Sequence, residues 1–302
     1  MNLAAVIFSA ATLLAAQFAT ATESPSAPTV TEVSGDIRLF RSQYFHLKSG
    51  LNGRVYRIMI AVPKSPAPAA SAPTLYVLDG NQYFETAATA AARYAYGGDI
   101  VSPVVVGIGY ATDNVPEILA ERAFDLTPSL PIDPNLKGRF GGGSVFAQVL
   151  ETEIIPFVRS RFGPDLKRQA IWGHSHGGLF VMASLLRNPT QFSHYILSSP
   201  SIWWNDREVL KSQDSFVRLL DTRTTQVSVL VTSASDEQYR GNDLARLSAD
   251  SRMVDNASDF AKWLDNLKSS SVKVQRTIFE DEGHGSAAPV SVNRAVRFAF
   301  RK

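Results

Sequence analysis

A serine between closely spaced glycines is the most chemically informative feature of this chain. Residues 171–178 read IWGHSHGG, with an apolar run before them and an apolar stretch of helical character after them. The Gly-x-Ser-x-Gly spacing is typical of a sharp strand-to-helix turn that presents a serine hydroxyl as a nucleophile. Glycines two residues before and after the serine let backbone approach where a Cβ would clash. We therefore expect Ser175 to be a catalytic nucleophile, with the backbone N–H of His176 as one oxyanion-hole donor.

A serine nucleophile needs a base to accept its proton, and histidine commonly serves. The chain has five histidines, of which His174 and His176 belong to the serine turn itself. His284 stands between Gly283 and Gly285, directly after the last expected strand, where a base loop would lie. The sequence therefore predicts His284 as the base that takes the proton and later returns it.

An acid that orients the base is expected after the seventh strand. Asp236 and Glu237 are adjacent there, and their position does not choose between them. The acid would hold the correct imidazole tautomer and stabilise the imidazolium. A second oxyanion-hole donor is expected after the third strand, from Gly80 or Asn81.

Composition and spacing exclude several other classes of protein. The chain of 302 residues has no cysteine, which excludes a thiol nucleophile and a cysteine-ligated metal. A net charge of +2 without basic runs does not indicate a nucleic-acid partner. His174 and His176 are two residues apart, whereas helical metal ligands are spaced by about three or four. The Gly-x-Gly-x-x-Gly spacing of a dinucleotide site is also missing, so we expect no metal and no cofactor.

Strands and helices alternate along most of the chain. Two antiparallel strands are expected first, followed by apolar strands and intervening helices that alternate as in a parallel sheet. The pattern predicts an α/β fold, an α/β-hydrolase with a mostly parallel sheet of about eight strands, helices on both faces and the serine after the fifth strand. The expected strands are 38–47, 54–62, 75–78, 101–110, 170–172, 195–198, 227–232 and 272–279, and the expected helices are 82–95, 144–162, 176–187, 207–220, 244–267 and 289–300.

The N-terminus has a different character from the rest of the chain. Residues 1–21 carry no charged side chain and end in Ala-Thr-Ala, which predicts a cleaved signal peptide and a periplasmic or secreted protein without a stable membrane anchor. Residues 22–29 are rich in Ser, Pro and Ala and are expected to form a flexible mature terminus. Residues 30–302 are expected to form a single domain, in which the proline- and glycine-rich stretch 111–143 is a long loop or lid.

Five segments together resemble one protein family. Residues 75–81 (LYVLDGN), 106–110 (VGIGY), 122–128 (RAFDLTP), 173–178 (GHSHGG) and 199–204 (SPSIWW) resemble, in this order, the esterase D-like α/β-hydrolases. Within that family they are most similar to the branch of enterobactin and salmochelin trilactone esterases. The resemblance spans nearly all of the mature chain, and the segments at 122–128 and 199–204 are its more specific parts.

The resemblance implies roles for individual residues. Ser175 and His284 would be catalytic, and Glu237 matches the family's acidic segment better than Asp236, although some siderophore esterases work as a Ser-His dyad. Arg122 matches an arginine associated with the polar substrate, although a structural ion pair with Asp125 would explain it equally well. Trp203 and Trp204 are candidates to face an aromatic catechol, although such a pair more often packs in a core.

The resemblance also implies an activity. The chain would be a serine esterase that opens the ester bonds of a catecholate siderophore trilactone through an acyl-enzyme and so releases iron. The loop at 111–143 has a net negative charge and does not by itself indicate an anionic ferric substrate. Two other interpretations remain: a general carboxylesterase acting on other esters or thioesters, and a periplasmic binding protein that kept the fold without catalysis.

Overall fold

The computed structural model describes residues 38–65, 71–163, 165, 167–221, 226–238 and 251–302. The expected signal peptide at 1–21, the terminus at 22–29 and the expected domain start at 30 lie outside these residues. Residues from Arg38 onward form one compact unit.

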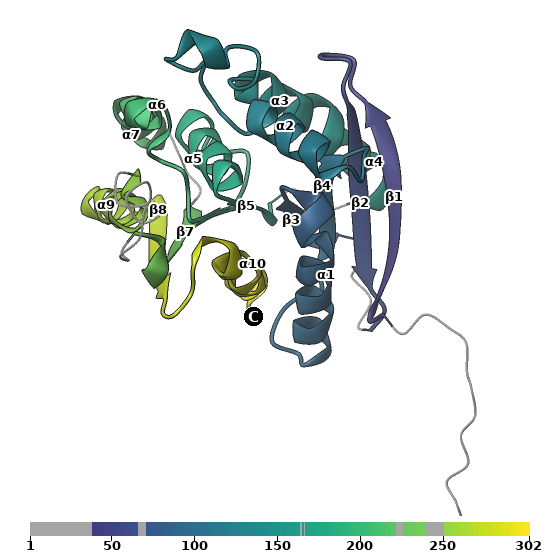
Figure 1. Ribbon diagram of the computed structural model, residues 1–302. Helices are drawn as coiled ribbons and strands as arrows, with labels where there is room; N and C mark the ends of the chain where they lie inside the picture. The colour runs from purple at the N-terminus through teal and green to yellow at the C-terminus, as the bar shows by residue number, and fades with distance from the viewer. Residues whose placement is uncertain (1–37, 66–70, 164, 166, 222–225, 239–250) are drawn as a thin grey trace, which may run out of the picture. The chain divides into compact units, whose positions relative to one another are not determined.

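In the described part of the chain, eight strands form a single sheet in the order β1-β2-β4-β3-β5-β6-β7-β8 (Figure 1). β1 is antiparallel to β2 and β2 to β4, and every other neighbouring pair is parallel. The strands are β1 (Phe40–Lys48), β2 (Val55–Pro63), β3 (Thr74–Val77), β4 (Val104–Tyr110), β5 (Gln169–His174), β6 (His194–Ser198), β7 (Val227–Ala234) and β8 (Val272–Phe279). The predicted α/β-hydrolase fold is confirmed.

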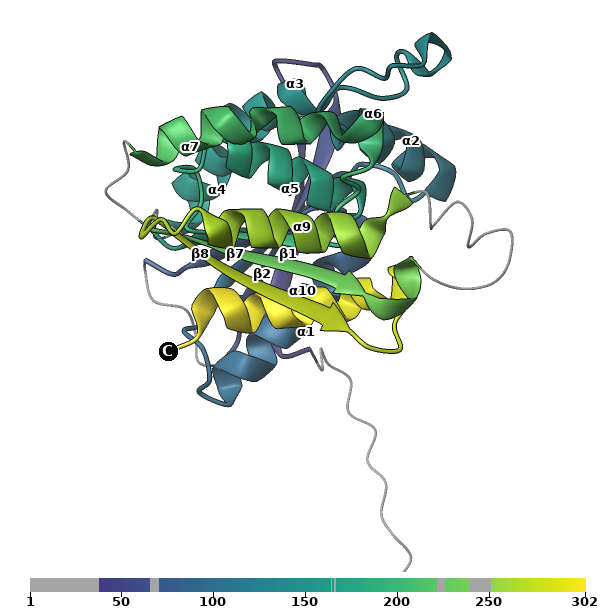
Figure 2. The ribbon, with the colours of Figure 1, turned by 90° about the vertical axis from the view of Figure 1, so that its left-hand side faces the viewer.

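Helices cover both faces of this sheet (Figures 1 and 2). One face carries α1 and α10, and the other carries α3, α4, α5, α7 and α9. The helices are α1 (Gly80–Tyr96), α2 (Val115–Asp125), α3 (Gly143–Val149), α4 (Ile155–Phe162), α5 (His176–Arg187), α6 (Trp204–Arg207), α7 (Gln213–Asp221), α9 (Met253–Asn266) and α10 (His284–Phe300).

The hydrophobic core is divided in two by the sheet. In β5, Ile171 joins the cluster under α5, while Ala170 and Trp172 join the cluster under α1 and α10. All three side chains are fully buried. Successive side chains of a strand point to opposite faces, so a strand covered on both faces must be continuously apolar. This is why β5 lacks alternation and why its end is held rigidly beneath the serine.

The predicted long loop at 111–143 contains a helix, α2, which corrects that part of the prediction. The Asn114 side chain accepts a hydrogen bond from Glu117 N at 3.2 Å and caps the helix. Pro116 lies in the first turn of α2, where a proline's missing N–H costs little. Pro116 therefore marks a helix start, and the rest of the stretch, residues 111–114 and 126–142, is irregular apart from a 3₁₀ turn at Pro134–Leu136.

Two other expected helices have different shapes in the structure. The stretch at 144–162 is helical but passes through a π-helical turn, Leu150–Ile154. The stretch near 207–220 is broken, because Asn205, Asp206 and Arg207 all have positive φ, between 50° and 61°. A 3₁₀ turn, Glu208–Ser212, follows them before α7 begins.

The last two helices differ from expectation at their starts. The described part of α9 begins at Met253, and residues 244–250 of the expected 244–267 helix lie outside the described residues. α10 begins at His284 rather than at Pro289, which lies inside the helix. The expected base is therefore the first residue of a helix and not part of a loop.

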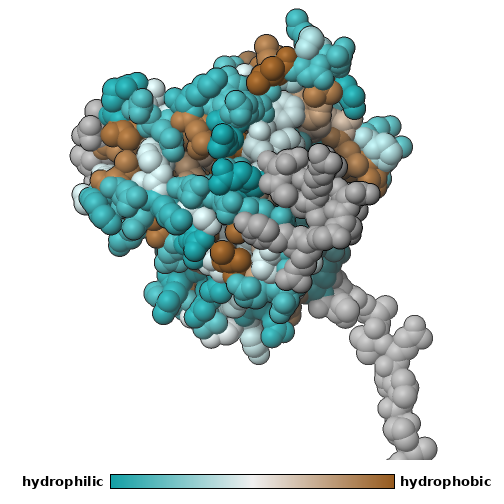
Figure 3. All heavy atoms as spheres, turned by 60° about the vertical axis from the view of Figure 1, so that its left-hand side comes forward, coloured by the Kyte–Doolittle hydropathy of each residue, from teal (hydrophilic) through white to brown (hydrophobic). Residues whose placement is uncertain are grey.

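The helices and one face of the surface bear on contact with a membrane. None of the helices in the described ranges is both long and apolar enough to cross a membrane. The face shown in Figure 3 is mostly hydrophilic, and its hydrophobic residues form separate small patches.

Candidate active site

Ser175 lies at the turn between β5 and α5, in strained backbone geometry. Its φ of 60° and ψ of −119° place it where L-residues are rarely found. A Cβ on Gly173 would overlap the backbone of Gly177, and a Cβ on Gly178 would lie 2.7 Å from the Ser198 carbonyl oxygen. Close backbone approach therefore requires a glycine at 173, as the sequence predicted, and also at 178. At Gly177, the second glycine of the motif, a Cβ would lie 3.3 Å from a side-chain atom, Asp79 Oδ2, and no backbone atom is as close.

The serine is held from two sides by the segment that follows β6. Ser175 N donates to Ser198 O at 2.9 Å, and Ser201 N donates to Ser175 O at 3.1 Å. Ser175 Oγ lies 3.3 Å from Ser201 Oγ. Among the described residues, no hydrogen bond joins Ser175 Oγ to the His284 ring. Catalytic hydrogen bonds are often long before a substrate binds, so this geometry does not remove His284 from the site.

His284 and Glu237 are brought together at the ends of β7 and β8. His284 Nδ1 lies 2.8 Å from Glu237 Oε1. The Glu237 side chain is fully buried and its other oxygen accepts a hydrogen bond from Ala234 N at 3.0 Å, while the His284 side chain is 45% exposed. A carboxylate fixed in this way holds Nδ1 protonated and leaves Nε2 free to accept a proton.

Asp236 has a different position from Glu237, although the two are adjacent. Its carboxylate accepts a hydrogen bond from Ser235 Oγ at 3.0 Å. Its backbone N donates to Glu282 O at 3.0 Å, and Asp281 N donates to Ser235 Oγ at the same distance. These bonds join the loops that follow β7 and β8. Of the two candidate acids, the geometry therefore brings Glu237, not Asp236, to His284.

The three expected oxyanion donors lie at the starts of two helices. Gly80 and Asn81 are the first residues of α1, and His176 is the first residue of α5. The first N–H groups of a helix have no partner within the helix, and they lie at its positive end. The Asn81 amide side chain is committed elsewhere, because it bonds Tyr110 through both its oxygen and its nitrogen. Only backbone N–H groups are therefore candidates.

His174 packs against the candidate base. The two rings have centroids 4.5 Å apart, and His174 Nδ1 lies 3.0 Å from Ser198 Oγ. Burial, followed by the nearby charges of His284 and Arg122, lowers the pKa of His174 to about 3. His174 therefore stays neutral and adds no positive charge beside the imidazolium that His284 would form.

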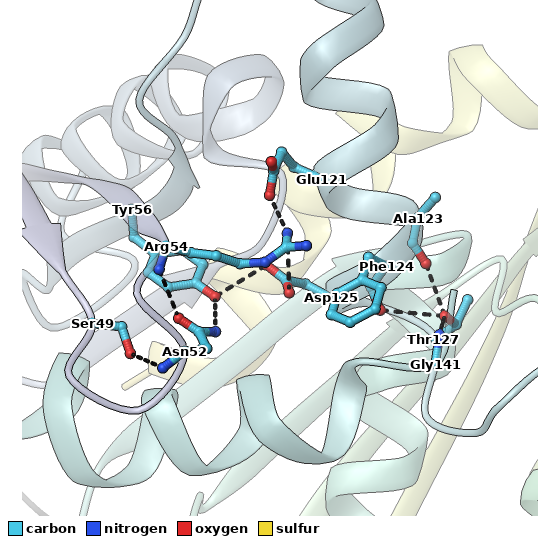
Figure 4. A network of polar contacts seen from close by, with 10 residues as sticks. All are labelled: Ser49, Asn52, Arg54, Tyr56, Glu121, Ala123, Phe124, Asp125, Thr127 and Gly141. Carbon is cyan, nitrogen blue, oxygen red and sulfur yellow. Dashed lines mark hydrogen bonds and ion pairs between the residues drawn. The ribbon is translucent and has the colours of Figure 1, made fainter. Parts of the chain in front are cut away.

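Arg122 does not lie free in the site as a substrate ligand, and it does not pair with Asp125. It forms an ion pair with Asp79, with Nε 2.7 Å from Oδ1. Asp125 instead pairs with Arg54 and accepts a hydrogen bond from Tyr56 at 3.1 Å (Figure 4). The alternative expectation of an Arg122–Asp125 pair is wrong, because Arg122 pairs with Asp79 and Asp125 pairs with Arg54.

The two tryptophans have different environments. Trp204 is buried and its ring centroid lies 4.8 Å from that of Phe140. Trp203 is 39% exposed, and its ring centroid lies 6.1 Å from that of His176. Of the two, Trp203 is therefore the more exposed and lies beside the serine turn, while Trp204 packs against Phe140 of the long loop.

Sequence reasoning missed two residues of this site. Asp79 and Ser201 both lie in segments that the sequence singled out, before Gly80 and after Ser199-Pro200. No local pattern marks either residue, because each depends on a partner far along the chain, Arg122 for Asp79 and Ser175 for Ser201. Among the residues described, no group of three or more His, Cys, Asp or Glu side chains could hold a metal ion.

Comparisons with known proteins place the chain among esterases. The family model described as "Putative esterase" matches residues 49–261. Ferri-bacillibactin esterase BesA of Bacillus subtilis is 35% identical over 264 residues, which cover 84% of this chain and 88% of that protein. Apo-salmochelin esterase of Escherichia coli O6:H1 is 32% identical over 279 residues, which cover 90% of this chain and 82% of that protein.

A solved structure gives the same result. The BES protein from Bacillus cereus matches with a TM-score of 0.76 and 30% identity, covering 90% of this chain and 99% of that one. The fold, the strained serine turn and these relatives define a serine hydrolase of the α/β-hydrolase class. The chain belongs to the "Putative esterase" family and is a carboxylic ester hydrolase, which confirms the resemblance found in the sequence.

Proposed function

We propose that this chain hydrolyses the ester bonds of a siderophore trilactone of the catecholate, enterobactin-like class, with Ser175 as nucleophile, His284 as base and Glu237 as the acid that orients His284. The observation that carries the catalytic assignment is the 2.8 Å contact between His284 Nδ1 and Glu237 Oε1, next to the strained serine turn. The substrate class is supported by the relatives, which are named as esterases of bacillibactin and salmochelin.

The chemistry follows from these positions. Ser175 Oγ attacks the ester carbonyl carbon while its proton passes to His284 Nε2. Negative charge moves to the carbonyl oxygen, towards the backbone N–H of His176 and the N–H groups that begin α1. The C–O bond then breaks, His284 protonates the departing alcohol, and the acyl group remains on Ser175. A water molecule, deprotonated by His284, then attacks the carbonyl carbon of this acyl-enzyme. The bond from that carbon to Ser175 Oγ breaks, His284 returns the proton to Ser175 Oγ, and the acid is released.

The test compares the wild type with Ser175→Ala on ferric and apo trilactones and on short p-nitrophenyl esters. We expect Ser175→Ala to lose about 10⁶-fold in kcat, as removal of a triad serine typically does, while substrate binding is retained. Mass spectrometry of the products identifies each bond that is cut. A variant that still hydrolyses ester at near the wild-type rate would refute the mechanism.

The same experiment separates the rival functions. A general carboxylesterase would prefer the p-nitrophenyl esters over the trilactones. A binding protein without catalysis would hydrolyse none of them and would not react with a fluorophosphonate at Ser175.

The uncharged apolar segment at 1–21 supports the further proposal that the protein is exported to the periplasm or secreted after cleavage following Ala21. The N-terminal mass of the exported protein checks this, and a mass that retains residues 1–21 would contradict it.

A further inference from the structure

Arg122 and Asp79 form a bidentate ion pair at the start of α1, whose first N–H groups are candidate oxyanion donors. Arg122 Nε donates to Asp79 Oδ1 at 2.7 Å, and its Nη2 donates to Oδ2 at 3.0 Å. The Asp79 side chain is 2% exposed and that of Arg122 15%. Burial opposes the charged guanidinium, but the Asp79 carboxylate outweighs it and raises the pKa of Arg122 above its usual range. A pair of this geometry fixes the direction of both side chains.

Asp79 lies in the connection between β3 and α1, in a conformation that a non-glycine residue rarely adopts. Its φ of 52° and ψ of 43° are left-handed. Its carbonyl oxygen accepts hydrogen bonds from Gln82 N at 2.9 Å and Tyr83 N at 3.1 Å, so it begins the helix. Its side chain makes no cap bond to the helix. The carboxylate is instead directed to Arg122, which holds the strained residue in place.

The first turn of α1 is positioned tightly by its surroundings. A Cβ on Gly80 would lie 2.8 Å from Ile108 N, so no larger residue fits there. Asn81 Nδ2 donates to Tyr110 O at 3.1 Å, and Tyr110 N donates to Asn81 Oδ1 at 2.7 Å. β4 therefore fixes one side of this turn and Arg122, through Asp79, fixes the other. The direction of the Gly80 and Asn81 N–H groups depends on both.

The Asp79 carboxylate also lies against the serine turn. A Cβ on Gly177 would be 3.3 Å from Asp79 Oδ2. Leu78 N donates to Trp172 O at 3.0 Å, which ties the Asp79 connection to β5. An uncompensated carboxylate at this place would repel the negative charge that develops on the carbonyl oxygen. Arg122 cancels that charge.

We infer that Arg122 is a positioning residue for the oxyanion hole: through Asp79 it fixes the turn that presents the Gly80 and Asn81 N–H groups, and it neutralises the carboxylate beside them. This inference rests on the proposed role of Ser175. It differs from the substrate-binding role that the sequence resemblance implies, because the guanidinium acts on the protein and not on the ligand.

The test uses a neutral substrate, p-nitrophenyl acetate, on which an arginine that binds an anionic ligand has no effect. We expect Arg122→Gln to lower kcat by about 10²-fold, near the loss caused by removing one oxyanion donor, with little change in KM. Arg122→Lys keeps the charge without the bidentate geometry, and its kcat should lie between those of the wild type and Arg122→Gln. The double variant Asp79→Asn/Arg122→Gln should recover about tenfold in kcat over Arg122→Gln, because it removes the uncompensated carboxylate.

Arg54→Gln is the matched control. Arg54 also anchors α2 by an ion pair, but to Asp125 and Glu121 and not to Asp79 (Figure 4). We expect this variant to keep its kcat for p-nitrophenyl acetate. Circular dichroism spectra and thermal melts would check that each variant is folded. An equal loss of kcat in Arg54→Gln would mean that a loosened α2 is sufficient, and it would overturn the inference.

Other results would also overturn it. Arg122→Gln with an unchanged kcat for p-nitrophenyl acetate and a raised KM only for an anionic ferric siderophore would make Arg122 a substrate ligand. A double variant no faster than Arg122→Gln would remove the electrostatic part of the argument. Failure of the proposed function is recognised separately, because Ser175→Ala would then retain activity whatever the Arg122 variants do.

Discussion

At the residue scale, the choice between the two adjacent acids gives a sharp prediction. Glu237→Gln should lower kcat by about 10⁴-fold, the size of the equivalent change in a Ser-His-Asp triad, because a glutamine amide stabilises the wrong tautomer of His284. Asp236→Asn is the matched control and should cause a much smaller loss, because its carboxylate bonds Ser235 and not His284. Steady-state kinetics on p-nitrophenyl acetate measure both. Equal and small losses would indicate a Ser-His dyad instead.

The same residues show how far a sequence can predict a site. The places of Ser175 and His284 in the fold were predictable, because a motif marks the first and a position after a strand marks the second. Position after a strand did not separate Asp236 from Glu237, and only the resemblance favoured Glu237. The two share one 3₁₀ turn, and the contact between the loops after β7 and β8 decides which carboxylate faces His284. The partner of Arg122 was equally hidden, because Asp79 lies 43 positions away in the chain.

At the element scale, the broken helix after Trp203 makes a prediction about the long loop. Asn205 Nδ2 donates to Ser129 Oγ at 2.8 Å and Ile132 N donates to Asn205 Oδ1 at 2.8 Å, although Asn205 has a φ of 50°. Asn205→Ala should lower the free energy of unfolding by about 2–3 kcal/mol. The variant loses the side-chain hydrogen bonds, and alanine is less favourable than asparagine in the left-handed backbone conformation of this position. Urea unfolding measures this change.

Asn205→Gly separates the two causes, because glycine tolerates positive φ but makes no side-chain hydrogen bond. It should recover about 1 kcal/mol relative to Asn205→Ala. Equal stabilities of the two variants would mean that backbone strain contributes nothing there, and a wild-type stability in both would mean that this side chain does not hold the 129–132 segment.

Helices and strands with a clear apolar pattern were predicted better than those that depend on contacts distant in sequence. Each strand from β3 to β7 is an apolar run buried on both faces, and each was found within a few residues of its expected place. The sequence does not predict α2, because a proline is typical of a loop, whereas Pro116 lies in the first turn of this helix. The break at Asn205–Arg207 was missed because it depends on hydrogen bonds to Ser129 and Ile132, which no local pattern encodes.

At the scale of the whole molecule, buried titratable groups of opposite type determine how stability depends on pH. Burial is the main cause that lowers the pKa of three described histidines, His174 to about 3 and His176 and His194 to about 4. As pH falls through 6.5, these histidines become protonated in the unfolded chain but stay neutral in the folded protein. Because the unfolded state then binds more protons, the free energy of unfolding decreases on acidification. Burial raises the pKa of Asp125 to about 7 despite Arg54 and Tyr56, and this acts in the opposite direction.

Asp125 in the folded protein holds a proton between pH values of about 4 and 7 that the unfolded chain has released, so its contribution to stability grows as pH falls through 7. Three histidines outweigh one aspartate, and we expect the wild type to lose about 2 kcal/mol per pH unit between about pH 6.5 and 5. Asp125→Asn removes the opposing proton and should steepen this loss by about 1 kcal/mol per pH unit.

Urea unfolding at several pH values measures the slope, which does not depend on any constant destabilisation that the substitution causes. A variant slope equal to that of the wild type would mean that Asp125 is already ionised in this range, and that Arg54 compensates its burial fully.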